Sequence, residues 1–182
     1  MTRVRSYTQY IVTGGNRGIG LEFVKQLAEA GKHVIATARD PEGASELQAI
    51  AKASERRVRV MKLDFVNKES VDAFVEQIKE LDVDVLINNA GIYPRSGGLG
   101  SLDWDTARQG FEVNTIAPLR LAEALLPNIK RSKGKAILNV STQMGSIDDN
   151  TSGGSYAYRM SKAALNMGTR SLAHDTRADD VI

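Results

Sequence analysis

Short apolar runs alternate with helical patterns along this whole chain, and this alternation restricts its fold more than any other feature. Each apolar run is short and uninterrupted, which is typical of a buried strand. The expected strands are Tyr10–Val12, His33–Ala38, Val58–Leu63, Val83–Ile87 and Ala136–Val140. Strands that alternate with helices pair in parallel, and right-handed connections place helices on both faces of the sheet. We therefore expect residues 1–182 to form a single doubly wound α/β domain.

Polar residues and prolines predict where the intervening helices begin. Asp40 is expected to be the N-cap of one helix, with Pro41 at its first position, and Asn67 is expected to cap the next helix. Pro118 and Pro127 are expected to cause irregularities in a long helix. The expected helices run from Arg17 to Ala30, from Asp40 to about Ser54, after Asn67, from Trp104 to about Lys130, and from Tyr156 to about Thr176.

Composition excludes several classes of function. A formal net charge of +2 is too small to indicate binding to nucleic acid or to an anionic membrane surface. The chain has no cysteine, so disulfides and thiolate metal sites are impossible, and its two histidines, His33 and His174, lack ligand spacing. No metal is expected. No apolar run is long enough to span a bilayer. We expect a cytoplasmic protein whose partner is a small molecule.

A glycine-rich turn, Thr13–Gly20, follows the first expected strand. Gly14 permits a tight turn out of the strand, Gly18 lets the backbone approach a phosphate closely, and Gly20 lets the following helix pack closely. The N-terminus of that helix offers unpaired N–H groups and a partial positive charge to an anion. The turn is therefore expected to bind the pyrophosphate of a dinucleotide.

The spacing of the glycines narrows the choice of ligand. It is Gly-x-x-x-Gly-x-Gly, which differs from the commonest dinucleotide fingerprint and lacks the Gly-Lys-Ser/Thr ending of a P-loop. Ile19 is also expected on the apolar face of the helix that follows. The residues of the turn expected to contact the cofactor are Gly14, Asn16, Arg17, Gly18, Ile19 and Gly20.

The end of the second strand predicts which nicotinamide cofactor binds. Folds of this type that prefer NAD place an acidic residue there to bind the ribose 2′-OH. Here Ala38 occupies that place and Arg39 follows it. Arg39 and Arg17 together suit a 2′-phosphate, so we expect NADP(H). In the alternatives, Arg39 is an ordinary solvated charge, or Asp40 binds the ribose.

Tyr158 and Lys162 are four residues apart on one expected helix and therefore share a face. A phenol is a reluctant base at neutral pH, and a nearby ammonium stabilises its ionised form. This pair is suited to acid/base chemistry, although an ordinary surface pair has the same spacing. The competing Tyr156 has Met160 at the lysine position. We assign Tyr156 to packing or to the rim of the substrate site.

These segments together resemble the short-chain dehydrogenase/reductase family. The resemblance runs from the first strand to the end of the chain and rests on five pieces in order: the glycine turn, Asn88-Asn89-Ala90-Gly91, Asn114, Ser141-Thr142, and Tyr158-x-x-x-Lys162. The segment 156–166 resembles the carbonyl-reductase and sniffer-like branch, which has C-factor-like bacterial relatives. The resemblance implies a Rossmann-type fold and nicotinamide-dependent carbonyl/alcohol chemistry.

The resemblance also implies roles for the catalytic residues. Tyr158 would donate a proton to the substrate oxygen, and Lys162 would also bind the nicotinamide ribose. Asn114 would hold a water in a proton relay, or would be a satisfied polar residue near Pro118. The family pattern Ser-Ser-x-x-Gly appears here as Ser141-Thr142-Gln-Met-Gly. We favour Thr142 as the hydroxyl that binds the carbonyl oxygen, with Ser141 as the alternative.

Further cofactor contacts follow from the same resemblance. The backbone of Asn88 to Gly91 is expected to lie along the cofactor, with Asn88, Ala90 and Gly91 as contacts. Asn88 is also expected to tie the sheet together. Asp64 resembles the acid that contacts adenine, and its alternative role is that of a simple turn residue.

Family members commonly continue beyond the point where this chain stops, at Val181-Ile182. We expect the C-terminal strands of the fold to be lacking, with the fifth strand left at an edge. Three explanations are open: the chain is a fragment, the rest of its sequence is missing, or it is a genuine short form with impaired turnover. The family also commonly forms dimers or tetramers through the helices Trp104–Lys130 and Tyr156–Thr176, so a homodimer or homotetramer is expected. The apolar residues expected to serve there, unless they face the sheet, include Leu119, Leu125, Ala163, Leu165 and Met167.

The function expected from these residues is NADPH-dependent reduction of an aldehyde or ketone to an alcohol. The alternatives are a non-catalytic NADP(H)-binding regulatory protein or an inactive truncated form, and dehydratase or epimerase chemistry on the same scaffold.

Overall fold

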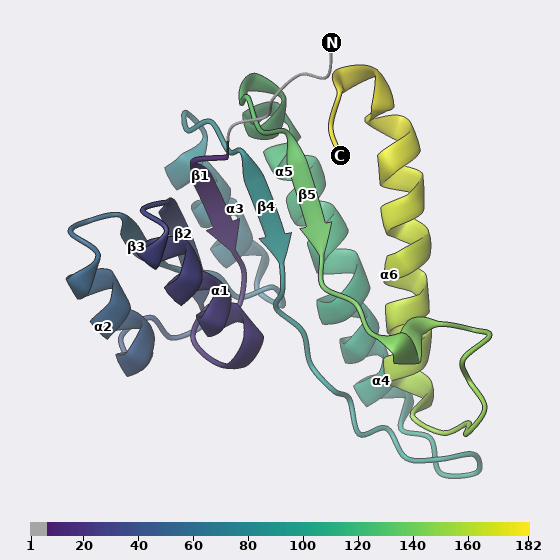
Figure 1. Ribbon diagram of the computed structural model, residues 1–182. Coiled ribbons are helices and arrows are strands. Elements are labelled where there is room, and N and C mark those ends of the chain that lie inside the picture. The colour runs from purple at the N-terminus through teal and green to yellow at the C-terminus, as the bar shows by residue number, and fades with distance from the viewer. Residues whose placement is uncertain (1–6) are drawn as a thin grey trace.

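A computed structural model describes residues 7–182, and its centre is a five-stranded sheet with the order β3-β2-β1-β4-β5 (Figure 1). All four neighbouring pairs are parallel. The strands are β1 Gln9–Val12, β2 His33–Ala38, β3 Val58–Lys62, β4 Val85–Asn88 and β5 Ala136–Asn139. The chain moves outward from β1 to β3 and then returns to add β4 beside β1. This reversal confirms the doubly wound fold and places its switch point between β1 and β4.

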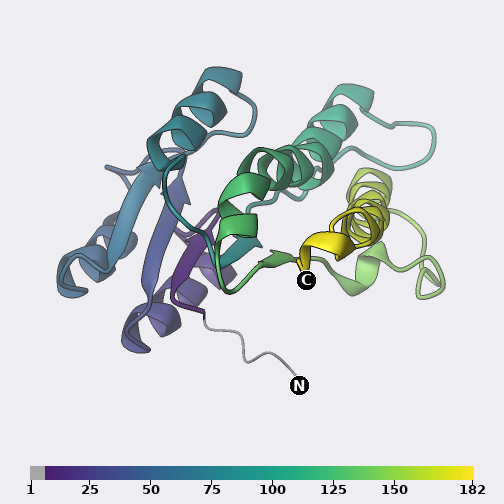
Figure 2. The ribbon, with the colours of Figure 1, turned by 90° about the horizontal axis from the view of Figure 1, so that it is seen from above.

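Helices cover both faces of the sheet, as Figure 2 shows from above. The register aligns Ile35, Ile11, Leu86 and Ile137 in one row across four strands. This row packs in a core to which α3 and α5 contribute, whereas α1 and α2 pack on the opposite face. The helices are α1 Gly18–Glu29, α2 Ser45–Ala53, α3 Lys68–Ile78, α4 Trp104–Phe111, α5 Ala117–Arg131 and α6 Tyr156–Asp175.

The N-cap prediction is confirmed for α3 and wrong for α2. The Asn67 side chain accepts a hydrogen bond from Ser70 N at 2.8 Å. Asp40 instead accepts from Gly43 N at 3.1 Å, and α2 begins only at Ser45. The Asp40 carboxylate closes a tight turn through Gly43, and this local turn competes with helix initiation.

The expected long helix is continuous from Trp104 to Arg131, but its middle is a π-helical turn, Glu112–Ile116. In this turn Ala117 N donates to Glu112 O, five residues back. Pro118 has no N–H to donate to the Asn114 carbonyl, which disfavours regular α-helical bonding there. The irregularity expected at Pro118 therefore lies in the turn that precedes it, while Pro127 is accommodated within α5.

Several residues expected to mediate association instead pack within the chain. Leu125 and Leu165 are buried in it. Leu119 packs closely against Gly168, where an added Cβ would lie 2.6 Å from Leu119 Cδ1. Met167, in contrast, is 68% exposed. The apolar residues of α5 and α6 thus serve mainly the fold of the chain itself.

β5 lies at one edge of the sheet, as expected, and Ile182 lies beside it. Ile137 N donates to Ile182 O at 2.7 Å, and Ile182 N donates to Lys135 O at 2.9 Å. These two bonds join the Ile182 backbone to the edge of β5. Across residues 7–182, no helix combines the length and the apolar character needed to cross a membrane.

Candidate active site

The glycine turn is shaped by close backbone contacts. Gly14 has φ +64°, and a Cβ there would lie 3.0 Å from Ala90 Cα. A Cβ on Gly20 would lie 2.2 Å from Gly14 O. Gly18 has φ +54° and faces open space, so its backbone is accessible at the start of α1. Each glycine is thus required by local geometry, and together they present the N-terminus of α1 to a ligand.

Thr13 and Asn89 join this turn to the segment after β4. Both belong to motifs noted in the sequence, but neither side chain was assigned a role there. Thr13 Oγ1 accepts from Asn89 N and Ala90 N, both at 3.0 Å. Asn89 Nδ2 donates to Thr13 O at 2.9 Å and to Gly14 O at 3.2 Å. Two polar residues at the carboxyl ends of adjacent strands were the signal that could have identified this pair.

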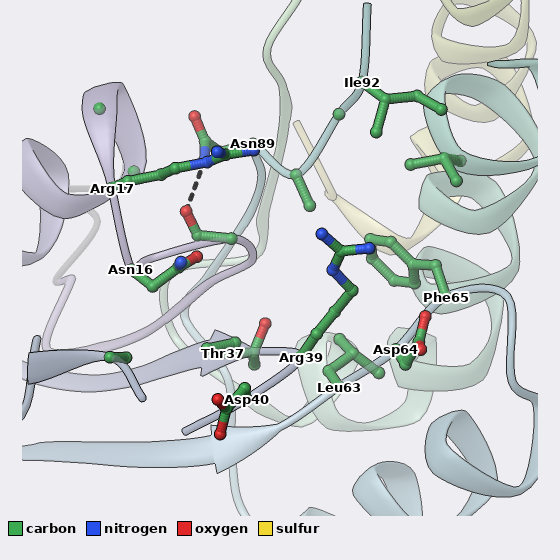
Figure 3. A pocket seen from close by; sticks show the side chains of 18 of the residues that line it. Asn16, Arg17, Thr37, Arg39, Asp40, Leu63, Asp64, Phe65, Asn89 and Ile92 are labelled. Atoms are coloured by element: carbon green, nitrogen blue, oxygen red, sulfur yellow. Dashed lines mark hydrogen bonds between the residues drawn. The ribbon is translucent and has the colours of Figure 1, made fainter. Parts of the chain in front are cut away.

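A cavity of about 590 Å³ opens at the carboxyl ends of β1 to β4, beside the switch point (Figure 3). Its volume lies within the range typical of ligand pockets. Ten residues expected to bind the cofactor line it: Gly14, Asn16, Arg17, Gly18, Ile19, Gly20, Arg39, Asp64, Ala90 and Gly91. Ile19 is 64% exposed, so its expected place on the packed face of α1 is wrong. It faces the cavity because it lies in the first turn of α1, at the mouth of the site.

Two arginines line the cavity from different elements. Arg39 extends from the end of β2 into the cavity (Figure 3). Asp40 also lines the cavity, and its carboxylate accepts from Gly43 N in its own turn. Arg17 lines the cavity from the glycine turn. At the end of β2, the place of an acidic residue is taken by Ala38, which is buried. With Arg39 beside it and no acid at the Ala38 position, the end of β2 is suited to a phosphate more than to a ribose hydroxyl.

Asp64 and Asn88 have structural contacts of their own. The Asp64 carboxylate accepts from Val66 N at 3.2 Å, which is a turn contact, although Asp64 also lines the cavity. Asn88 lies outside the cavity lining and is buried. Its Nδ2 donates to Asn139 Oδ1 at 2.9 Å and to Pro118 O at 3.2 Å. Asn88 therefore ties β4 to β5 and α5, as expected, and its contact with the cofactor stays a prediction.

Lys162 lies just beyond the cavity lining, next to Gly91. It is 5% exposed, and its Nζ donates to Val140 O at 2.8 Å. A Cβ on Gly91, which lines the cavity, would lie 3.7 Å from Lys162 Nζ. Burial lowers the pKa of the Lys162 ammonium below its ordinary value, because the charged form loses hydration. Tyr158 is half-buried one turn earlier on α6.

Asn114 is fully buried in the π-helical turn. Its Oδ1 accepts from Ile92 N at 2.8 Å, and its Nδ2 donates to Ile92 O at 2.9 Å and to Ser161 Oγ at 3.0 Å. Both amide hydrogens are thus used within the protein. Asn114 clamps the segment after β4 onto α6, and its role in holding a water stays a prediction.

The two candidate hydroxyls after β5 have different partners. Ser141 Oγ donates to Asn166 Oδ1 at 2.7 Å. Thr142 Oγ1 accepts from Met144 N at 3.3 Å, at the start of a short 3₁₀ turn, Gln143–Gly145. Within residues 7–182, the Thr142 hydroxyl proton has no hydrogen-bond acceptor, whereas that of Ser141 has Asn166. Sequence spacing alone left these two residues unresolved.

The fold and these residues agree with the comparison to known families. The chain belongs to the short chain dehydrogenase family, whose model matches residues 9–182. The family is one of oxidoreductases.

Individual relatives give the same assignment. C-signal of Myxococcus xanthus is 42% identical over 110 residues, which are 60% of this chain and 66% of C-signal, just under two thirds. Carbonyl reductase Sniffer of D. melanogaster superposes with a TM-score of 0.91 at 34% identity, over 97% of this chain and 78% of that one. An NADPH-bound carbonyl reductase from chicken fatty liver has a TM-score of 0.89 at 36% identity, over 98% and 77% of the two chains.

Proposed function

We propose that this protein is an NADP(H)-dependent carbonyl reductase that converts an aldehyde or ketone to an alcohol. The observation that carries the proposal is the position of buried Lys162, on the same helix as Tyr158, next to Gly91 at the end of a cavity of dinucleotide size. The carbonyl reductases with similar structures support it, one of them as its NADPH complex.

The residues of the cavity fit an NADP(H) molecule. The accessible backbone at Gly18 and the N-terminus of α1 suit the pyrophosphate. Arg17 and Arg39 suit the 2′-phosphate, and Asp64 would lie toward the adenine. Gly91 lies toward Lys162, so that end suits the nicotinamide. When bound, NADPH supplies a hydride.

Proton transfer falls to Tyr158. As the carbonyl carbon gains a hydride, its oxygen takes the Tyr158 phenol proton, which leaves an alcohol and a phenolate. The Lys162 ammonium, held by Val140 O, stabilises that phenolate electrostatically. Solvent then returns a proton to Tyr158, with Asn114 in the proposed relay.

We assign the hydroxyl that binds the carbonyl oxygen to Thr142. Ser141 already donates its proton to Asn166, whereas Thr142 uses only its acceptor capacity in its own turn. A free hydroxyl proton can stabilise the charge that develops on the substrate oxygen.

Cofactor preference tests the assignment of Arg17 and Arg39 to the 2′-phosphate. Changing Arg39→Asp should lower kcat/KM with NADPH by about 10- to 100-fold, because charge-assisted bonds to the 2′-phosphate are lost. Arg56→Asp is a matched control, since Arg56 is exposed in a turn outside the cavity. Equal efficiency with NADH and NADPH in the unchanged chain would contradict the preference for NADP(H).

A further inference from the structure

A second tyrosine, Tyr93, lies against the proposed proton donor. It belongs to the segment after β4, and its ring centroid is 4.6 Å from that of Tyr158, with an angle of 44° between the ring planes. Aromatic rings attract each other in such tilted arrangements. Neither cofactor binding nor the proposed proton transfer uses Tyr93, so this contact needs an explanation of its own.

The backbone on both sides of Tyr93 is fixed. Ile92 is bound through its N–H and its C=O to the buried Asn114 side chain, at 2.8 and 2.9 Å. Pro94 is buried on the other side, where a Cβ on Gly110 would approach its ring to 2.7 Å. The backbone that carries Tyr93 is therefore held on both sides, although Tyr93 itself is 52% exposed. Such exposure is unusual for an aromatic residue that serves only to fill a core.

The far end of Tyr93 is anchored at the start of α6. The Tyr93 hydroxyl and Ser155 Oγ are 2.6 Å apart and share a hydrogen bond. Ser155 has φ +47° and is the residue before α6, yet its side chain makes no capping bond to that helix. The first turn of a helix leaves backbone N–H groups unpaired and frays unless other contacts hold it. Tyr158 is the third residue of α6 and lies in this uncapped turn.

We infer that Tyr93 is a positioning residue for the Tyr158 phenol, a role that rests on the proposed function of Tyr158 as the proton donor. Its ring restricts the Tyr158 ring, and its hydroxyl holds the uncapped start of α6 through Ser155. Tyr93 thus fixes the proton donor relative to the Asn114-clamped segment that borders the cofactor cavity. Positioning of a reacting group affects turnover more than it affects binding of the cofactor.

Three substitutions separate the ring from the hydroxyl. Tyr93→Leu removes both the ring contact and the bond, whereas Tyr93→Phe and Ser155→Ala each remove only the bond. We expect Tyr93→Leu to lower kcat by about 3- to 10-fold. The Kd for NADPH should change by less than about twofold, since Tyr93 lies outside the cavity lining. Tyr93→Phe and Ser155→Ala should lower kcat less than Tyr93→Leu does, and by similar factors. Leu99→Ala, at an 84% exposed position of the same segment, is the control.

NMR of tyrosine labelled with ¹³C in the ring measures positioning without turnover. The signal of Tyr158 is assigned with Tyr158→Phe. In Tyr93→Leu this signal should shift and broaden, while in Tyr93→Phe it should stay near its original place. A Tyr158 signal that is unmoved in Tyr93→Leu, or a kcat equal to that of the unchanged chain, would overturn the role of Tyr93. If the unchanged chain reduces no carbonyl, the proposed function fails, and the Tyr158 signal alone then supports or overturns the positioning.

Discussion

At the scale of single residues, Lys162 is the most costly feature of the site. A buried ammonium loses hydration, and the hydrogen bond to Val140 O returns only part of that free energy. The lowered pKa of Lys162 has the same cause. A chain selected for stability alone would place an apolar side chain here, so the position of Lys162 is best explained by chemistry at Tyr158.

The substitution Lys162→Met separates stability from activity. We expect turnover to fall by at least about 100-fold, because the phenolate loses its counter-charge. The free energy of unfolding at neutral pH should be unchanged or higher, because the buried charge is gone. Chemical denaturation and steady-state kinetics on the same preparations measure both. A large loss of stability together with full turnover would contradict this account.

The pH dependence follows from the direction of the Lys162 pKa shift. The folded chain releases this proton more readily than the unfolded chain, so folding is penalised at neutral pH, and the penalty is relieved as pH rises through the lowered pKa toward 10.5. The stability advantage of Lys162→Met should therefore shrink with rising pH in that range. For carbonyl reduction, kcat should decline on an alkaline limb that begins below pH 10.5, because the ammonium is needed. A rate that stays flat up to that value would be inconsistent with a charged Lys162 in catalysis.

Paired alanine substitutions decide between the two hydroxyls. Thr142→Ala should lower kcat by about 100-fold, as for loss of one donor to a developing oxyanion. Ser141→Ala should lower kcat far less, because the Ser141 hydroxyl is already hydrogen-bonded to Asn166. The opposite order, read from kcat with the KM for NADPH unchanged, would transfer the role to Ser141.

At the scale of elements, periodicity predicted the strands and most helices, because a strand or helix that is apolar on one side has few ways to bury it. Local polar signals were less dependable. Asn67 caps its helix, but Asp40 closes a turn instead, and both behaviours use the same side-chain chemistry. The π-helical turn depends on Pro118 together with the distant contact of Asn114 with Ile92. A pattern along the chain does not contain that contact.

Among the residues of the site, too, only those related by local spacing could be predicted from the sequence. Tyr158 and Lys162 could be paired from their spacing, because helix geometry fixes it. Tyr93 could not, since its contacts with Tyr158 and Ser155 join segments about sixty residues apart. The hydrogen bonds between Thr13 and Asn89 could not be predicted for the same reason, because these residues are 76 positions apart.

The glycine turn gives a prediction at this scale. Gly20→Ala should lower the free energy of unfolding by about 1 to 3 kcal/mol and weaken NADPH binding, because the new Cβ would meet the Gly14 carbonyl oxygen. Gly98→Ala is the control, since it faces open space. Thermal unfolding and NADPH titration measure the two effects. Equal behaviour of the two variants would show that Gly20 is not constrained as described.

At the scale of the whole molecule, we propose that the chain associates as a homodimer or homotetramer. Apolar side chains remain exposed on α4, on the π-helical turn and on α6, namely Trp104, Ile116, Met160 and Met167. Sedimentation velocity at micromolar concentration should show a species larger than a monomer, and Met167→Glu should weaken it. A monomer in the unchanged chain would refute association. The expected cytoplasmic location stays a prediction, as does the expectation that the fold continues beyond Ile182.

The most direct test of the central claim is NADPH oxidation by the unchanged chain with a broad panel of aldehydes and ketones, beside Tyr158→Phe. The account predicts formation of one alcohol for each NADPH consumed, and a loss of at least about 100-fold in kcat for Tyr158→Phe with an unchanged Kd for NADPH. NADPH binding without turnover of any carbonyl would favour a non-catalytic NADP(H)-binding protein, and full activity of Tyr158→Phe would contradict the assignment of the proton donor.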